Sequence, residues 1–310
     1  MTESVYGILV ELLIFVAVGF VLRKLNILEA DLSSRLSDFL PKLVLPFSLI
    51  ASSQQEFKAS SAGGTLISIG LAFLYYLVFF IILRLILPKL FHSYESRPVA
   101  YDLCAFANVG FLGFAVVPLI FGENGTLYTI SHNFVYQLLF FTIGMDIVED
   151  SAHSVKEMLH PKKFLTNKII LVSILSMALY VLPFRFPQII TNSFRAVGSM
   201  MTPLSLIIVG LQIGALDLKA LLKEKGVVSL SLIRMLLLPA VYFCILLILP
   251  LDAALKGVAF ILSAMPSGSL TAVIAERYNR TPVLASSVVA LTTILYFLLL
   301  PLDITLIRFF

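Results

Sequence analysis

Ten apolar segments, each long enough to cross a lipid bilayer, restrict the folds open to this chain of 310 residues. A crossing needs about 20 apolar residues, and a backbone inside lipid must pair its own polar groups, as a helix does. Hydrophobic residues make up 59% of the chain and charged residues 13%, with a mean hydropathy of +1.01. We therefore predict an all-α polytopic membrane protein with spans near residues 5–22, 36–53, 64–88, 98–121, 126–147, 167–184, 190–214, 227–249, 253–275 and 282–307.

The basic residues between the spans predict how the chain is oriented. Lysines and arginines are concentrated after odd-numbered spans, as in Arg23, Lys24, Lys162 and Lys163, and are sparse after even-numbered spans. Cytoplasmic loops carry such an excess, so we expect both termini outside the cytoplasm. Because Arg23 and Lys24 follow the first apolar segment, we expect it to be a span and not a cleaved signal peptide. The net charge of +4 is explained by this topology, and nucleic acid is not an expected partner.

A weak internal repeat links the two halves of the chain. Residues 46–50 (PFSLI) in span 2 recur as residues 203–207 (PLSLI) in span 7. The same offset aligns residues 108–110 of span 4 with residues 265–267 of span 9. Five spans per copy is an odd number, so the second copy enters the membrane in the opposite sense, as in the inverted repeats of many secondary transporters. We expect a first five-helix repeat at 1–148, a cytoplasmic linker at 149–166 and a second, inverted five-helix repeat at 167–310.

Spans 4 and 9 carry unusual residues at corresponding depths. These residues are Asn108, Gly110 and Gly113 in span 4, and Pro266, Ser267 and Ser269 in span 9. One interpretation is a pair of kinked helices whose small residues allow close packing. The other is a pair of discontinuous helices that cross near the midplane and form a transport site. The occurrence of both interruptions at equivalent places in the repeat favours the second interpretation.

Crossed, broken helices would create a site for a charged ligand. Each half-helix N-terminus carries unpaired N–H groups and about half a positive charge, which suits a carboxylate. The half-helix C-termini could instead hold a cation. Asn108, Ser267 and Ser269 would add side-chain hydrogen bonds, although packing or bonding within their own helices also explains them. The pattern therefore predicts a site for a charged ligand and leaves a carboxylate and a cation both open.

Span 5 contributes a second group of polar residues. Asn133, Tyr136 and Gln137 share one face of a helix, and that face should look into the protein, because polar groups facing lipid are costly. A substrate contact and a structural network between helices are both open interpretations. His132 is either a helix-contact residue or a proton carrier.

Few charged residues fall within the spans, and each is a functional candidate. Arg234 in span 8 could face an anionic substrate, neutralise a carboxylate during transport, or extend to the membrane surface. Glu11 in span 1 is a candidate for coupling. Asp102, Asp146 and Asp303 lie near span ends, where we expect them to be solvated.

Several other functions receive less support from the sequence. Cys104 and Cys244 lack the spacing of a disulfide framework or a zinc site, and no cofactor or metal is expected. No P-loop is present, so H+, Na+ or the substrate gradient itself would drive transport. An intramembrane hydrolase using Ser267 or Ser269 with His132 would lack the usual Gly-x-Ser-x-Gly elbow. An anion channel or a membrane sensor without coupled transport is the main alternative to a carrier.

At these residues the chain resembles the auxin efflux carrier family, which includes plant auxin exporters and bacterial permeases thought to move malate- or malonate-like acids. Asn108, Gly110 and Gly113 fit the first crossing motif of the family, but Ala115 stands where its proline is expected. Pro266 fits the second crossing motif. Further matches are residues 275–278 (AERY), Asn133 and Gly144 in span 5, Pro203 and Gly210 in span 7, and Arg234 with Pro239 in span 8.

The resemblance covers nearly the whole chain, without the large cytoplasmic loop of the plant exporters. It implies a compact bacterial-type carrier of the inner membrane, with crossed helices in a transport domain that moves against a scaffold, as in bile acid symporters. The expected partners are the small organic anion and the lipid bilayer, and a homodimer is an allowed assembly.

Overall fold

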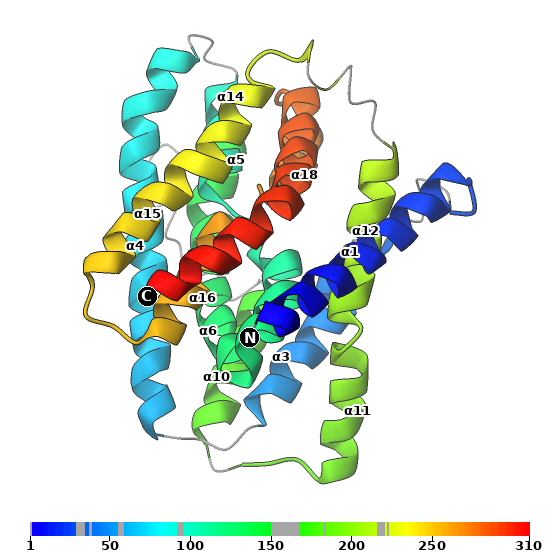
Figure 1. Cartoon of the computed structure of the whole chain (residues 1–310), viewed down its shortest axis with the longest axis vertical. Helices are drawn as coiled ribbons and strands as arrows, with labels where there is room; N and C mark the ends of the chain where they lie inside the picture. Colours follow the sequence, from blue (N-terminus) through cyan, green and yellow to red (C-terminus); the bar gives the residue numbers. More distant parts are fainter. Residues whose placement is uncertain are drawn as a thin grey trace. The chain divides into compact units, whose positions relative to one another are not determined.

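The computed structural model describes residues 2–28, 35–36, 39–54, 59–91, 96–149, 168–182, 184–215, 221 and 223–310. The described residues form helices and no β-strand (Figure 1). The chain divides into two compact units. Unit 1 comprises residues 1–69, 109–134 and 167–216, and unit 2 comprises residues 70–108, 135–166 and 217–310. Each unit therefore contains segments from both predicted repeats.

The helices follow the predicted spans closely. Four of them, Gly63–Leu90, Gln188–Ala215, Val227–Ile248 and Pro282–Phe309, are long and apolar enough to cross a membrane among the described residues. Shorter apolar helices occupy Lys42–Ala51, Val109–Gly122, Leu171–Tyr180 and Ala253–Ala264. The all-α fold is confirmed, while the count of ten spans and the inverted repeat stay predictions.

Unit 1 holds α1 (Thr2–Lys24), the π-helical turn η1 (Leu40–Val44), α3 (Leu45–Ser53), α10 (Lys168–Val181), α11 (Gln188–Gly198) and α12 (Met201–Ala215). It also contains η2 (Val109–Gly113) and the first parts of α4 (Ala59–Leu90) and α6 (Phe114–Leu139). Within α6 the chain turns sharply at Gly122, whose φ of 64° suits a residue without a side chain.

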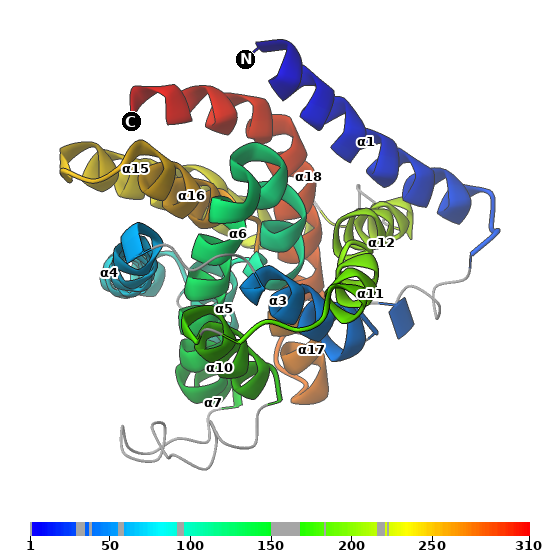
Figure 2. The ribbon, with the colours of Figure 1, turned by 90° about the horizontal axis from the view of Figure 1, so that it is seen from below.

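Helices α1 and α12 of unit 1 pack side by side at glycines (Figure 2). A Cβ atom added to Gly210 would collide with the backbone oxygen of Val16, and one added to Gly19 would collide with that of Ile207. Small residues of this kind let the backbones of two helices touch. The close contact therefore depends on both glycines.

One helix break in unit 1 was not predicted. Within the apolar helical stretch Gln188–Ala215, a turn at Ser199 and Met200 separates α11 from α12. Pro203 explains the break, because it has no N–H to donate to the carbonyl of Ser199 and its ring would clash with that carbonyl in a continuous helix.

Unit 2 holds the remaining parts of α4 and α6 with α5 (Arg97–Ala105), η3 (Phe140–Gly144), α7 (Met145–Glu149), α14 (Val227–Leu232), η4 (Ile233–Leu237), α15 (Leu238–Ile248), α16 (Ala253–Ala264), α17 (Ser269–Arg277) and α18 (Pro282–Leu306). Helices α15 and α16 lie side by side (Figure 2). Buried aromatic rings fill its interior, and the Tyr242 hydroxyl donates to Leu71 O at 2.7 Å.

Candidate functional site

Spans 4 and 9 are both interrupted inside unit 2. Helix α5 ends at Ala105, and residues 106–108 follow without helical structure. Helix α16 ends at Ala264, and α17 begins at Ser269 after residues 265–268. The break in span 4 thus begins before the glycines of its motif, at Phe106, and the glycines themselves lie in the wide turn η2 that follows.

The two interruptions pair with one another. The Asn108 N–H donates to Pro266 O at 2.8 Å, and the Gly268 N–H donates to Phe106 O at 2.9 Å. These bonds form an isolated antiparallel bridge between Ala107 and Ser267. Backbone polar groups buried away from water need partners, and each broken segment supplies them for the other. A Cβ atom on Gly268 would lie only 3.2 Å from Phe106 O, so the glycine allows this approach.

Other helices of unit 2 hold the crossing in place. The Ser267 N–H donates to the hydroxyl of Thr292 on α18 at 3.2 Å. The Tyr75 hydroxyl on α4 donates to Ala105 O at 3.0 Å, at the C-terminal end of α5. Helix α18 therefore bonds to the interrupted segment of span 9, and α4 bonds to the end of α5 in span 4.

Arg234 brings a buried positive charge to the crossing. It lies in the π-helical turn η4, with 0% of its side chain exposed. Its Nη2 donates to Met265 O at 2.5 Å, and its guanidinium lies 5.7 Å from the centre of the Phe79 ring. Nε and Nη1 have no hydrogen-bond partner among the described residues. The guanidinium also interacts with the Tyr75 hydroxyl, and its two unpartnered nitrogens could donate to a ligand.

Unit 2 contains most of the residues predicted for the substrate site. Asn108, Pro266 and Ser267 belong to the paired segments, and Ser269 begins α17. The Ser267 hydroxyl is fully buried and unpartnered within the described part of the chain. Gln137 is also buried in unit 2, and its Oε1 likewise has no partner there.

Unit 1 contains the remaining predicted residues. A Cβ atom on Gly110 would lie 3.7 Å from Asn133 Oδ1, so these two residues are close together. Neither polar atom of the buried Asn133 side chain has a partner among the described residues. Gly113, on the same turn as Gly110, is buried, as is His132. Glu11 is exposed on α1.

The expectation that three aspartates are solvated was wrong. Asp102, Asp146 and Asp303 have exposed fractions of only 1%, 5% and 8%. Asp102 is the informative case, because its Oδ2 accepts a hydrogen bond of 2.6 Å from the Thr271 hydroxyl. Its position near the start of span 4 suggested an accessible end, but α5 has only nine residues and leads directly to the break. The position of this carboxyl, one helical turn before an interrupted segment, was the signal in the sequence that could have predicted its burial.

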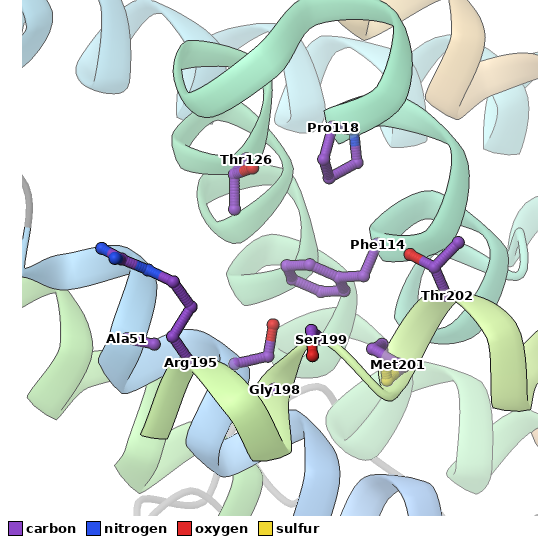
Figure 3. Close-up of a pocket in the computed structure, with 10 residues that line it drawn as sticks. Ala51, Phe114, Pro118, Thr126, Arg195, Gly198, Ser199, Met201 and Thr202 are labelled. Atoms are coloured by element: carbon purple, nitrogen blue, oxygen red, sulfur yellow. The ribbon is translucent and has the colours of Figure 1, made fainter. Parts of the chain in front are cut away.

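Two cavities lie away from the paired segments, one in each unit. The cavity in unit 1 has a volume of about 200 Å³ and is lined by Arg195, Thr126, Phe114 and Thr202 among others. Figure 3 shows the Phe114 ring between Thr126 and Arg195 on one side and Thr202 on the other. The cavity in unit 2 has about 440 Å³ and opens beside Phe91 and neighbouring residues. Neither is lined by a predicted site residue, and the described residues contain no cluster of metal-binding side chains.

Comparisons with known proteins identify the family. The comparison with curated proteins gives no match. The sequence model of a family described as membrane transport protein matches residues 4–304, which is nearly the whole chain. This match agrees with the resemblance to auxin efflux carriers at the level of the family. The chain therefore belongs to the membrane transport protein family and is a membrane transporter.

Proposed function

We propose that the protein is a secondary active transporter of small organic anions such as carboxylates. The substrate binds at the paired segments of spans 4 and 9 and is carried by alternating access. The observation that carries this proposal is Arg234, a fully buried cation bonded to the crossing at Met265 O, with two nitrogens unpartnered among the described residues.

The chemistry of Arg234 favours an anion. A buried charge is costly unless it is paired, and the hydrogen bond from Arg234 Nη2 goes to a neutral carbonyl, while Nε and Nη1 have no partner among the described residues. A guanidinium presents parallel N–H groups that match the two oxygens of a carboxylate. The N-terminus of α17, which begins at Ser269, adds a partial positive charge. An acid bound there would supply the missing counter-charge.

The other predicted residues receive roles in this proposal. Asn108, Ser267, Ser269 and Gln137 donate hydrogen bonds to the anion, and Pro266 keeps its segment open. Gly110, Gly113 and Asn133 stay predicted substrate residues, while Glu11 and His132 remain candidates for coupling to H+ or Na+. We further propose ten spans as two inverted repeats, both termini outside the cytoplasm, a bacterial inner membrane and a malate- or malonate-like substrate.

Transport of labelled malate into vesicles of phosphatidylethanolamine and phosphatidylglycerol tests the proposal. Mono- and dicarboxylates are first screened by thermal shift, since a ligand of the folded state raises its apparent stability. Arg234→Gln should weaken uptake by about 10- to 100-fold, because hydrogen bonds to a charged group are worth about 1.5 to 3 kcal/mol. Arg84→Gln is the control, as Arg84 is exposed on α4. Uptake by Arg234→Gln at the parent rate would refute the role of this charge.

The same vesicles separate the alternatives. A carrier accumulates malate above the outside concentration when a gradient drives it, whereas a channel or sensor does not. Ser267→Ala should only weaken a carrier, but it would abolish a hydrolase that used this serine. Complete loss of activity together with release of a hydrolysis product would contradict the transport proposal.

A further inference from the structure

A side-chain hydrogen bond joins the two half-helices beside the crossing. Asp102 lies on α5, one turn before the break in span 4, and Thr271 lies in the first turn of α17, just after the break in span 9. The Thr271 hydroxyl donates to Asp102 Oδ2 at 2.6 Å. This bond therefore links α5 to α17 and would break if these two half-helices moved apart.

The second oxygen of Asp102 is enclosed but unpartnered. Oδ1 has no hydrogen-bond partner among the described residues, and the side chain is 1% exposed. A Cβ atom added to Gly144 would lie 2.7 Å from Oδ1 and 2.8 Å from the Phe106 ring, so glycine leaves room for the carboxyl. An ionised carboxylate in such a place costs several kcal/mol in lost hydration. The protonated acid avoids this cost.

Among the described residues, no cation on a neighbouring helix is in contact with the Asp102 carboxyl. Tyr76 from α4 and Tyr136 from α6 are the phenols within electrostatic range of its carboxyl. Arg234 on η4 is directed instead to Met265 O and the Phe79 ring.

The other charged groups on elements packed against α5 and α17 do not neutralise Asp102 either. Asp146 on α7 and Asp303 on α18 are buried carboxyls of the same sign, and Glu276 and Arg277 are exposed at the end of α17. Among the described residues, Asp102 forms no salt bridge and accepts only the Thr271 hydrogen bond.

We propose that Asp102 binds and releases the proton that couples transport to a pH gradient. This inference rests on the proposed function and names its coupling ion. The proton adds to a carboxylate oxygen from water on one side of the membrane and returns to water on the other side.

Charge balance explains why the proton and the anion travel together. In the loaded state Arg234 pairs with the bound carboxylate and Asp102 is protonated. In the empty state Arg234 has no anion, and the ionised Asp102 balances its charge within the same unit. For each carboxylate that the substrate brings to Arg234, both states then carry no net charge from these groups, whereas a carboxylate bound without a proton on Asp102 leaves one buried negative charge in excess.

Asp102→Asn tests the coupling, because asparagine is a permanently neutral mimic of the protonated acid. In vesicles of phosphatidylethanolamine and phosphatidylglycerol that contain no malate, with the membrane potential held at zero, the parent should accumulate labelled malate about tenfold for each pH unit imposed, if one proton accompanies each anion. The variant should show no accumulation in these vesicles, but in separate vesicles loaded with unlabelled malate it should still exchange labelled for unlabelled malate. Asp303→Asn, which removes another buried carboxyl of unit 2, should keep gradient-driven accumulation.

The outcomes separate this inference from the proposed function. If the parent shows neither accumulation nor exchange, the carrier proposal fails. If the parent responds to the pH gradient and Asp102→Asn responds equally, the carrier proposal survives and the role of Asp102 is refuted.

Infrared difference spectroscopy gives a second measurement that needs no substrate. Between about pH 5 and about pH 9, a range above the usual carboxyl titration, the parent should show a protonated carboxyl band that titrates, and Asp102→Asn should remove a part of this band that Asp303→Asn leaves in place. Thr271→Val should change the pH at which this band is half-maximal, and Thr271→Ser should restore it. If Asp102→Asn fails to fold, the band shifts of Thr271→Val and Thr271→Ser decide whether Asp102 is the titrating group. A band that none of these substitutions alters would overturn the proposal.

Discussion

The hydrogen bond from Ser267 to Thr292 offers a measurable test of how the crossing is held. Thr292 is fully buried on α18, where its hydroxyl accepts the Ser267 N–H at 3.2 Å and donates to Val288 O at 2.7 Å. Thr292→Val preserves shape and leaves the Ser267 N–H without its acceptor. An orphaned buried donor costs about 1 to 3 kcal/mol. At about 2 °C per kcal/mol, a low value suited to a chain of this size, the melting temperature should fall by about 2 to 6 °C.

The adjacent residue provides a matched control. Thr293 is buried to a similar degree, but its hydroxyl donates only to Val289 O of its own helix at 2.7 Å. Such back-bonding contributes little to helix stability, so Thr293→Val should leave the melting temperature close to that of the parent. Both variants are compared in the same detergent, and amide hydrogen exchange at Ser267 should accelerate only in Thr292→Val.

Two results would refute the reasoning. Equal losses of stability in Thr292→Val and Thr293→Val would show that either hydroxyl stabilises the helix to the same extent. The hydrogen bond from Ser267 would then add no measurable stability. Unchanged exchange at Ser267 in Thr292→Val would show that its N–H does not depend on this acceptor.

Two glycine substitutions test the close contacts, each against an uncrowded glycine. Gly144→Ala should destabilise the protein by about 1 to 3 kcal/mol, the usual cost of overpacking, because its Cβ would press on Asp102 Oδ1. A Cβ at Gly70 meets nothing within 4 Å, so Gly70→Ala should be neutral or stabilising. Gly210→Ala should cost more than about 3 kcal/mol, because its Cβ meets backbone of α1 that cannot rotate away, and Gly7→Ala on α1 should cost nothing. Melting temperatures in detergent check both pairs, and equal values within either pair would contradict the packing argument.

Local sequence signals account for the helices and for their breaks. Continuous apolar segments predicted the spans, because lipid leaves the backbone no other partner than its own helix. Pro266 marked the break in span 9 through its missing N–H. Pro203 acts in the same way on Ser199, and the same rule applied to span 7 would have predicted the division into α11 and α12.

The contacts of the candidate site could not be predicted in this way. Pairing of Phe106 with Gly268 joins segments far apart in the chain, and the donor in each bond is a backbone N–H that every residue except proline carries. The burial of Asp102 likewise depends on Thr271 and Gly144, which lie in two other spans. The polar residues of the site could be recognised from their residue types in apolar spans. Their hydrogen-bond partners could be identified only from the three-dimensional structure.

The bonds at the crossing also indicate how a bound substrate would be carried. Six hydrogen bonds within unit 2 hold the interrupted segments and the helix ends beside them: two between the backbones of the segments, and one each with the side chains of Thr292, Arg234, Thr271 and Tyr75. At about 0.5 to 1.5 kcal/mol each, with the larger values for charged partners, they sum to several kcal/mol, a large part of the stability of a typical domain. Opening the crossing would forfeit most of that sum in each transport cycle. The alternating access that we propose therefore costs less free energy if the paired segments stay closed and the substrate stays bonded to them.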